Sequence, residues 1–477
     1  MNGSARVSGP LPGHPGIIMS GFDLGKVGYT LGEFFLEGAA ASFEPVGPVG
    51  ADGHWQVNRS GRASFTTRLV ACWPTDPGAF TGTVLLEWLN VSAGFDAPAH
   101  WMLTHRQVVR SGWAWVGVSA QRAGIEGGSI FEAAGTEPDD ASRRIRLPAL
   151  KESDPGRYGG LHHPGDAFCF DIFTQAARAV RGGGVLGSLP VECLLGTGQS
   201  QSAIHLVSYV NALAPTVPAE AACDGYLIGS RAGRAAPLDG WDGRIRSEGP
   251  DGVRVRTDSQ APVLTVQTET DVTGVLGGVT ARQPDSSRLR WWEIAGAAHA
   301  DTYVLGAGFS DSGELPPAEL ARLLAPTAEV FGTRFPAPVN SGPQHHYVAQ
   351  AAIAHLDRWA RGGPPPPRSP RLETAGDHTR LVTDEAGIAR GGIRTGWVDV
   401  PVAVLSGLPP DGAPPFGTIL GTTRVFGEAE LARRYPRGRS EYAGAFRAAT
   451  ARAAAEGFLL AEDADEIVAV ATAAYPL

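Results

Sequence analysis

The sequence predicts an α/β fold, a mostly parallel central sheet with helices on both faces. Short apolar runs that fit buried strands alternate with stretches in which apolar residues recur at helical spacing. Thr83–Leu89 is one such strand, the helix Ala97–Arg110 follows it, and Trp113–Ser119 is the next strand. This order forms a βαβ unit, which makes the two strands parallel and places a helix over the sheet.

Further expected elements lie on both sides of this unit. Glu33–Phe43 and Phe65–Trp73 predict an antiparallel beginning of the sheet. The other expected strands are Val191–Leu195, Cys223–Ile228, Val263–Gln267 and Arg290–Ile294. Helices are expected at Tyr347–Arg361, Glu441–Glu456 and Asp463–Ala474.

The composition restricts the class of function. The chain has 477 residues, a hydrophobic content of 43% and a net charge of −9. No long run of one charge sign occurs, which argues against nucleic acid as a partner. No segment approaches the roughly 20 apolar residues of a membrane span, and the first residues lack the apolar core of a signal peptide. These features predict a cytoplasmic protein without a membrane span.

The sequence predicts neither a metal site nor a cofactor. None of the four cysteines belongs to a C-x-x-C pair, so we expect buried free thiols. The pairs His162-His163 and His345-His346 have no carboxylate or cysteine at metal-binding spacing. The run Gly182–Gly184 lacks the lysine of a phosphate-binding loop and follows a helix, not a strand.

The stretch G-Q-S-Q-S at 198–202 carries the strongest catalytic signal. It joins the expected strand Val191–Leu195, through a turn at Gly196 and Gly198, to a helix. Ser200 therefore lies on a sharp strand-to-helix turn, the nucleophile elbow of the α/β-hydrolase fold, beside a helix N-terminus. The usual fifth residue is glycine, and Ser202 is small enough to replace it. An N-cap serine after a glycine-rich loop is the alternative.

A serine nucleophile needs a base, and the base needs an acid that orients it. In this fold the chain order is serine, acid, histidine, with the acid and the histidine each following a strand. His299 follows the last expected strand and is the candidate base. We expect Asp271 to be the acid because it lies further past its strand than the alternative, Glu269. Asp301, just beyond the histidine, is expected to be exposed to solvent.

The oxyanion that forms when serine attacks an ester needs two preplaced donors. One expected donor is the backbone N–H of Gln201, next to the nucleophile. The other is expected after the strand Thr83–Leu89, where Asn90 or Val91 is the candidate; an ordinary turn is the alternative. Asp96, at the end of this loop, is a good N-cap for the following helix.

Several short motifs resemble those of a family of bacterial α/β-hydrolase-domain proteins of poorly defined activity. They are E-W-L-N-V-S at 87–92, H-P-G-D at 163–166, G-x-S-Q-S at 198–202, T-E-T-D at 268–271, G-A-A-H at 296–299 and G-G-I-R-T at 391–395. The resemblance covers nearly the whole chain. It implies a serine ester hydrolase in which Ser200 is the nucleophile and His299 the base. The acid is then Asp271 or Glu269.

The chain divides at the stiff, proline-rich spacer Gly362–Pro370. Residues 1–362 are the predicted catalytic domain, in which 121–160 and 300–345 are expected to be lid or pocket segments. Residues 363–477 are predicted to be a C-terminal extension packed on that domain. Aromatic and leucine residues in these segments favour a small-molecule ester of partly apolar character as substrate.

These features together predict a carboxylic-ester hydrolase, a serine esterase that forms an acyl-enzyme without a cofactor. An acyltransferase would use the same residues, with an alcohol in place of water as the acceptor. A non-catalytic binding protein of the same fold is the alternative from another class. The ordered serine, acid and histidine argue against it.

Overall fold

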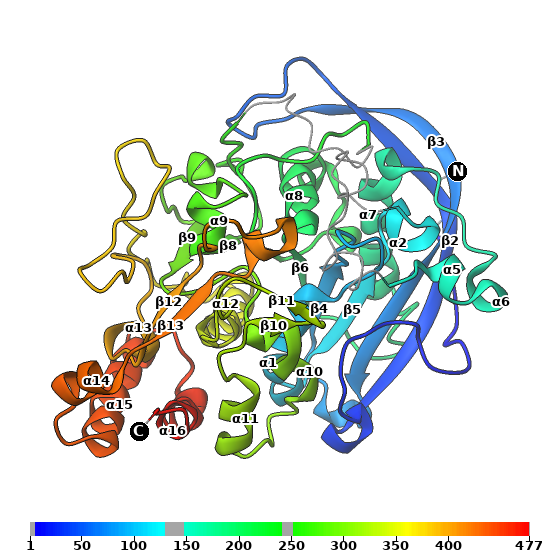
Figure 1. The fold of residues 1–477 in the computed structure, drawn as a ribbon. Helices are drawn as coiled ribbons and strands as arrows, with labels where there is room; N and C mark the ends of the chain where they lie inside the picture. Colours follow the sequence, from blue (N-terminus) through cyan, green and yellow to red (C-terminus); the bar gives the residue numbers. More distant parts are fainter. Residues whose placement is uncertain (1–4, 129–146, 241–250, 477) are drawn as a thin grey trace.

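A nine-stranded sheet forms the centre of the computed structural model, which describes residues 5–128, 147–240 and 251–476 (Figure 1). The strand order is β1-β2-β3-β5-β4-β6-β7-β8-β9. The first three strands and β5 pair antiparallel, and all pairs from β5 to β9 are parallel, as predicted. The strands are β1 (Arg6–Ser8), β2 (Tyr29–Pro45), β3 (Val57–Pro74), β4 (Thr83–Trp88), β5 (Ala114–Val118), β6 (Cys193–Gln199), β7 (Gly225–Gly229), β8 (Val263–Thr268) and β9 (Leu289–Ile294).

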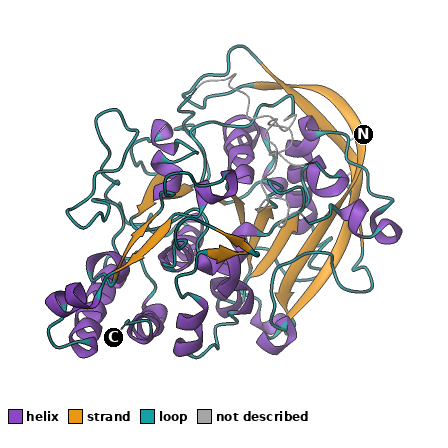
Figure 2. Cartoon of the chain, viewed as in Figure 1, coloured by secondary structure: helices purple, strands orange, loops and turns teal. Residues whose placement is uncertain are grey.

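Helices cover both faces of this sheet (Figure 2). Alternating side chains of the strands belong to two apolar clusters, one on each face. Leu85 of β4 and Leu195 of β6 belong to the apolar cluster on one face. Their neighbours Leu86 and Leu194 belong to the cluster on the other face. Burial on both faces explains why the central strands are continuous apolar runs. The helices of the first face are α1 (Ala99–Arg110) and α12 (Gln344–Ala360), and those of the second are α7 (Cys169–Arg181) and α8 (Gln201–Ser208).

The N-terminus of α1 is capped by a residue of the sheet. The buried carboxylate of Glu87 on β4 accepts the N–H groups of His100 and Trp101 at 2.7 and 3.0 Å. Asp96, the expected cap, instead receives the guanidinium of Arg68 at 2.7 Å. The predicted N-cap is therefore wrong, because an ion pair in the interior holds the aspartate away from the helix.

The C-terminal part of the chain packs against the first face of the sheet. Trp292 of β9 and Trp359 of α12 lie in the same apolar cluster as Val398, Phe446 and Ile467. Figure 1 shows these late elements, orange to red, beside α12. They are α13 (Gly396–Asp399), β12 (Ala403–Ser406), β13 (Thr422–Val425), α14 (Glu428–Arg434), α15 (Arg439–Ala455) and α16 (Ala464–Ala473).

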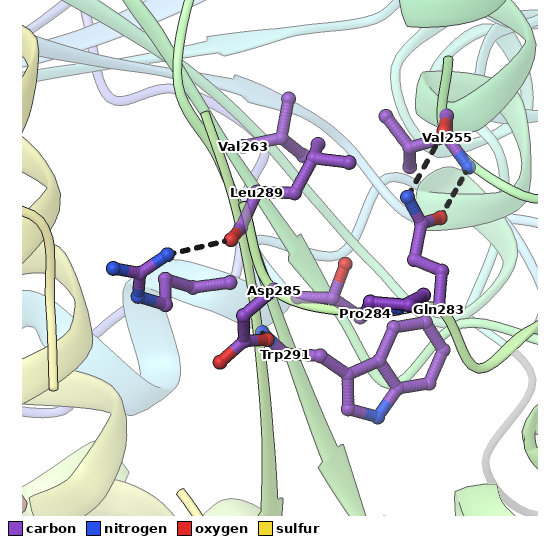
Figure 3. Close-up of a pocket in the computed structure, with 9 residues that line it drawn as sticks. Val255, Val263, Gln283, Pro284, Asp285, Leu289 and Trp291 are labelled. Atoms are coloured by element: carbon purple, nitrogen blue, oxygen red, sulfur yellow. Dashed lines mark hydrogen bonds between the residues drawn. The ribbon is translucent and has the colours of Figure 1, made fainter. Parts of the chain in front are cut away.

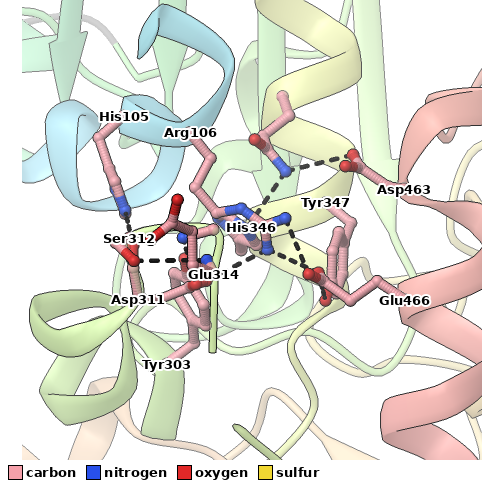
Figure 4. A network of polar contacts seen from close by, with 12 residues as sticks. His105, Arg106, Tyr303, Asp311, Ser312, Glu314, His346, Tyr347, Asp463 and Glu466 are labelled. Carbon is pink, nitrogen blue, oxygen red and sulfur yellow. Dashed lines mark hydrogen bonds and ion pairs between the residues drawn. The ribbon is translucent and has the colours of Figure 1, made fainter. Parts of the chain in front are cut away.

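A polar network fastens α16 to α1 (Figure 4). Arg106 of α1 donates to both carboxylate oxygens of Glu466 at 2.6 and 2.9 Å, and to Asp311 at 3.2 Å. The hydroxyl of Tyr303 donates to Asp311 at 2.8 Å, and that of Tyr347 donates to Glu466 at 2.7 Å. The charged side chains are largely removed from solvent. Each charge therefore depends on its partners for stabilisation.

In their described residues, the two expected lid segments contain short elements, apart from the first two residues of α12. The first segment, 121–160, includes residues 129–146, which lie outside the described part of the chain. Its described elements are α2 (Arg122–Glu126), α5 (Leu150–Ser153) and α6 (Pro155–Tyr158). The second segment, 300–345, contains the π-helical turn η8 (Tyr303–Ala307), α10 (Gly308–Ser310), α11 (Pro317–Leu323), β10 (Glu329–Val330) and β11 (Thr333–Arg334).

All four cysteines are described, and they are buried free thiols, as predicted. Burial raises the pKa of the Cys223 thiol to about 12, which makes it a poor nucleophile at neutral pH. In the described ranges, none of the helices has the length and apolarity that crossing a membrane requires.

Candidate active site

Ser200 occupies the turn between β6 and α8 with a strained backbone. Its φ of 62° and ψ of −121° lie in a region that residues other than glycine rarely adopt. Strand β6 continues through the two glycines that were expected to form a turn and ends at Gln199. The whole change of direction therefore falls on the serine. A Cβ at Gly198 would lie 2.8 Å from the carbonyl oxygen of Ser202, so this position requires glycine.

Ser202, at the fifth position of the motif, closes the turn through its side chain. Its hydroxyl accepts the N–H of Gln199 and donates to the carbonyl oxygen of the same residue, both at 3.0 Å. The N–H of Ser200 donates to Gly229 of β7 at 2.9 Å. The serine in place of glycine thus has a structural reason. Its hydroxyl adds hydrogen bonds that stabilise the turn, which a glycine could not make.

Asp271 and His299 form a buried hydrogen-bonded pair. His299 Nδ1 lies 2.6 Å from Asp271 Oδ1. The other carboxylate oxygen accepts the N–H and the hydroxyl of Thr268 at 2.7 and 2.8 Å. Burial opposes ionisation of Asp271, but the neighbouring imidazole and the hydrogen bonds outweigh it and lower the pKa of the carboxyl. Asp271 is therefore an anion suited to orient the imidazole.

Glu269, the alternative acid, is directed elsewhere. Its Oε1 accepts the N–H of Gly296 at 2.5 Å, and its Oε2 accepts the N–H of Gly407 at 2.8 Å. Full burial raises the pKa of this carboxyl to about 7, against the lowering effect of these N–H groups. Of the two candidate carboxylates, only Asp271 hydrogen-bonds to His299 among the described contacts.

Asp301 is buried, so the expectation that it would be exposed is wrong. Its Oδ1 accepts the N–H of Val304 at 3.0 Å, at the start of η8. Its Oδ2 has no hydrogen-bond partner among the described residues. Burial raises the pKa of this carboxyl to about 7. The chain folds back over the segment after His299, which the local polarity of the sequence did not indicate.

The backbone N–H groups of Asn90 and Val91, two of the expected oxyanion donors, differ in whether they could bind an oxyanion. The N–H of Asn90 donates to Ala97 at 3.0 Å, so this backbone group is already used and is removed from the candidates. The N–H of Val91 faces the side-chain oxygen of Gln201 at 3.3 Å, a long hydrogen bond that an oxyanion could replace. The Asn90 side chain donates to Gln199 at 3.0 Å and holds this loop against the elbow.

The three candidate catalytic side chains follow β6, β8 and β9, at the carboxyl edge of the sheet. Asp271 and His299 are in contact. Among the hydrogen bonds of the described residues, none joins Ser200 Oγ to the His299 ring. Such bonds are often long without substrate and tighten when it binds.

Two buried histidines were not assigned a role from the sequence: His345, which lies near this pair, and His100, which lies near His345. His345, at the start of α12, is buried, and its Nδ1 has no partner in the described part of the chain. Burial lowers its pKa to about 4, and the charges of Asp271 and His299 act on it. His100 contacts the Thr197 hydroxyl and is held neutral by burial, which lowers its pKa to about 3. No local sequence pattern connects these histidines to the site, because only the fold brings them there.

Two cavities among the described residues lie away from Ser200 and His299. The first, of about 10 Å³, lies at the amino ends of β8 and β9 and could hold at most one water molecule (Figure 3). The second, of about 270 Å³ and mainly apolar, lies between the C-terminal extension, at Trp397 and Tyr442, and the segment 300–345, at Leu324 and Pro343. The described residues contain no group of three or more side chains that could hold a metal ion.

The sequence matches one family model over almost its whole length. A family model described as "Alpha/beta hydrolase domain" matches residues 3–469. A thermostable esterase from Pseudomonas putida ECU1011 is 15% identical over 64% of this chain and 82% of its own, with a TM-score of 0.29. A fungal esterase from Rhizomucor miehei is 13% identical over 68% and 85%, with a TM-score of 0.32. A carboxylesterase from Lactobacillus plantarum WCFS1 is 10% identical over 50% and 78%, with a TM-score of 0.26. Among curated proteins, none matches the sequence.

Proposed function

The chain belongs to the alpha/beta hydrolase domain family, and on this basis we propose that it is a carboxylic-ester hydrolase with Ser200 as its nucleophile. The observation that supports this most is the hydrogen bond of 2.6 Å between Asp271 and His299. It lies at the same sheet edge as the strained turn at Ser200. Ser200 is half-buried, and acyl transfer requires an oriented imidazole and a serine hydroxyl that the substrate can reach.

In the proposed reaction, Ser200 Oγ attacks the ester carbonyl carbon while His299 Nε2 takes the hydroxyl proton. Asp271 holds the proton on Nδ1, so the other ring nitrogen is the base. The tetrahedral intermediate then collapses, and the alcohol leaves with the proton from His299. Water, deprotonated by the same imidazole, attacks the acyl-enzyme, and the carboxylic acid departs as Ser200 regains its proton.

The proposed oxyanion donors are the N–H groups of Gln201 and Val91. Gln201 is the first residue of α8, where unpaired N–H groups and the helix dipole favour negative charge. In this proposal, the oxyanion replaces the Gln201 side-chain oxygen that the N–H of Val91 now faces.

The surroundings of His299 support an ester of partly apolar character. Ala300 belongs to a small apolar cluster that also contains residues of the second lid segment and of the C-terminal extension. The cluster includes Leu305 and Ile419, which are only partly buried. We propose that the acyl or alcohol group lies against these side chains, because apolar surface next to a catalytic base favours an apolar group there.

Active-site labelling tests the proposal. A fluorophosphonate should add once to the wild-type protein, and peptide mapping should place it on Ser200. The Ser200→Ala variant should remain unlabelled, and its kcat on p-nitrophenyl esters should fall on the order of 10⁶-fold. Ser440→Ala, at an exposed position of α15, is the matched control and should behave as wild type. Labelling or esterase activity that survives in Ser200→Ala would refute the proposal.

A further inference from the structure

The loop Gly296–His299 is held by residues that lie far away in the sequence. The carboxylate of Glu269 joins it to the C-terminal extension, because one oxygen accepts the N–H of Gly296 and the other that of Gly407. Ala297 in the same loop accepts the N–H of Glu269 at 3.1 Å. One buried side chain thus connects the segment before His299 to a residue of the extension.

A second chain of hydrogen bonds connects the same two parts of the molecule. The backbone N–H of His299 donates to the hydroxyl of Thr270 at 3.0 Å, and this hydroxyl donates to the carbonyl oxygen of Gly407 at 2.5 Å. The backbone group of His299 is therefore fixed through Thr270 to the extension. Both the N–H and the carbonyl of Gly407 serve this connection.

Gly407 approaches the loop too closely for any side chain. A Cβ at this position would lie 2.3 Å from the carbonyl oxygen of Ala297 and 2.7 Å from the N–H nitrogen of Thr270. Its backbone thus fits directly against the residues that precede the acid and the base. Beyond His299, the N–H of Ala300 donates to Ile419 of the extension at 3.0 Å.

We propose that Glu269 and Gly407 are positioning residues for His299, so that the C-terminal extension holds the base of the esterase in its working geometry. The role of His299 as base rests on the proposed function. The Glu269–Gly407 clamp, meaning the contacts of these two residues with Gly296, Ala297 and Thr270, acts through the loop and touches no substrate.

Two variants and one control test the clamp. Glu269→Gln keeps the shape of the side chain but replaces one accepting oxygen with an NH₂ group, which opposes one of the two N–H donors. Gly407→Ala introduces the close contacts described above. Gly427→Ala is the matched control in the same extension, because a Cβ there meets no atom within 4 Å and its φ is −72°.

Two measurements separate positioning from general damage. With p-nitrophenyl acetate, kcat of both clamp variants should fall about 10- to 100-fold, while KM changes less than about threefold. In ¹H NMR, the strongly deshielded proton of the His299–Asp271 hydrogen bond, assigned by its loss in Asp271→Asn, should shift or broaden. Gly427→Ala should match wild type in both measurements.

The proposal is overturned if folded Glu269→Gln keeps the wild-type kcat and proton resonance, or if it changes only KM. If Gly407→Ala does not fold, Glu269→Gln alone decides. The NMR measurement does not need turnover. If Ser200 proves not to be the nucleophile, the proposed function fails, while the resonance still shows whether the clamp holds His299.

Discussion

The elbow at Ser200 and the loop at His299 lie at the same edge of the sheet but are held in different ways. The elbow is closed by hydrogen bonds between the Ser202 hydroxyl and Gln199, three positions apart, and by a hydrogen bond to the neighbouring strand β7. The His299 loop is closed by Glu269 and by Gly407, which lie 138 positions apart in the sequence.

This difference shows which parts of the sequence determine the positions of Ser200 and of His299. A strained backbone such as that of Ser200 costs about 1–3 kcal/mol and persists only where its surroundings enforce it. For the elbow, those surroundings are mostly local. The His299 loop depends on the rest of the fold, so changes far away in the sequence should disturb the base before they disturb the nucleophile.

Among the changes that separate the two regions, the one at Asp271 has the largest expected effect. Asp271→Asn should lower kcat on the order of 10⁴-fold, because the amide favours the wrong tautomer of His299. The elbow should remain intact, so a fluorophosphonate should still reach one label per molecule at Ser200, only more slowly. Steady-state kinetics and intact-protein mass spectrometry check both points. A loss in Asp271→Asn no larger than that in Glu269→Gln would move the role of acid away from Asp271.

The next effect concerns the attachment of the C-terminal extension. Arg106→Leu removes the cation that Glu466 and Asp311 share and should lower the free energy of unfolding by about 3–5 kcal/mol, since buried charges lose their partner. Urea denaturation followed by tryptophan fluorescence measures it. The control is Arg452→Leu, because the Arg452 side chain is 52% exposed beside Asp399. This change should lower the free energy of unfolding by less than about 1 kcal/mol. Equal effects in both variants would contradict a buried link.

The smallest expected effect is a pH dependence next to His299. Burial raises the pKa of Asp301 to about 7, so the folded state holds this proton more tightly than the unfolded state. Its contribution to stability is present at low pH and is lost as the pH rises through about 7. Between pH 5 and pH 8, the free energy of unfolding of the wild type should fall by about 3 kcal/mol relative to that of Asp301→Asn, because each pH unit contributes about 1.4 kcal/mol. Thermal or urea unfolding at several pH values measures this, and a constant difference would refute it.

The parts of the site that the sequence predicts correctly are those with local signals. The parallel sheet follows from apolar runs such as that of β4, whose side chains are buried on both faces. The strand-to-helix turn at Ser200 follows from its small neighbours and from the change of period, although the strand extends further than expected. These signals are readable because strand periodicity and turn chemistry act over a few residues.

The features that the sequence missed depend on partners distant in the chain. Asp96 has the chemistry of an N-cap, but its carboxylate instead forms an ion pair with Arg68 of β3. Asp301 has the chemistry of a surface residue, but the chain after it folds over it. From the sequence, only the distance from the strand end distinguished Glu269 from Asp271 as the candidate acid. The hydrogen bond that occupies Glu269 comes from the N–H of Gly407, in the distant extension. Single-sequence patterns contain no information about such pairings.

The closure of the His299 loop by Gly407 and Ile419 also sets an order of events during biosynthesis. A ribosome adds about 5–20 residues per second, and domains form from the N-terminal side. The elbow can form once β7 has left the exit tunnel, whereas the loop must wait for a segment made on the order of ten seconds or more later. A nascent chain therefore carries Ser200 for that interval without a fixed His299. Under the proposed function, ester hydrolysis would begin only when the C-terminal extension has docked.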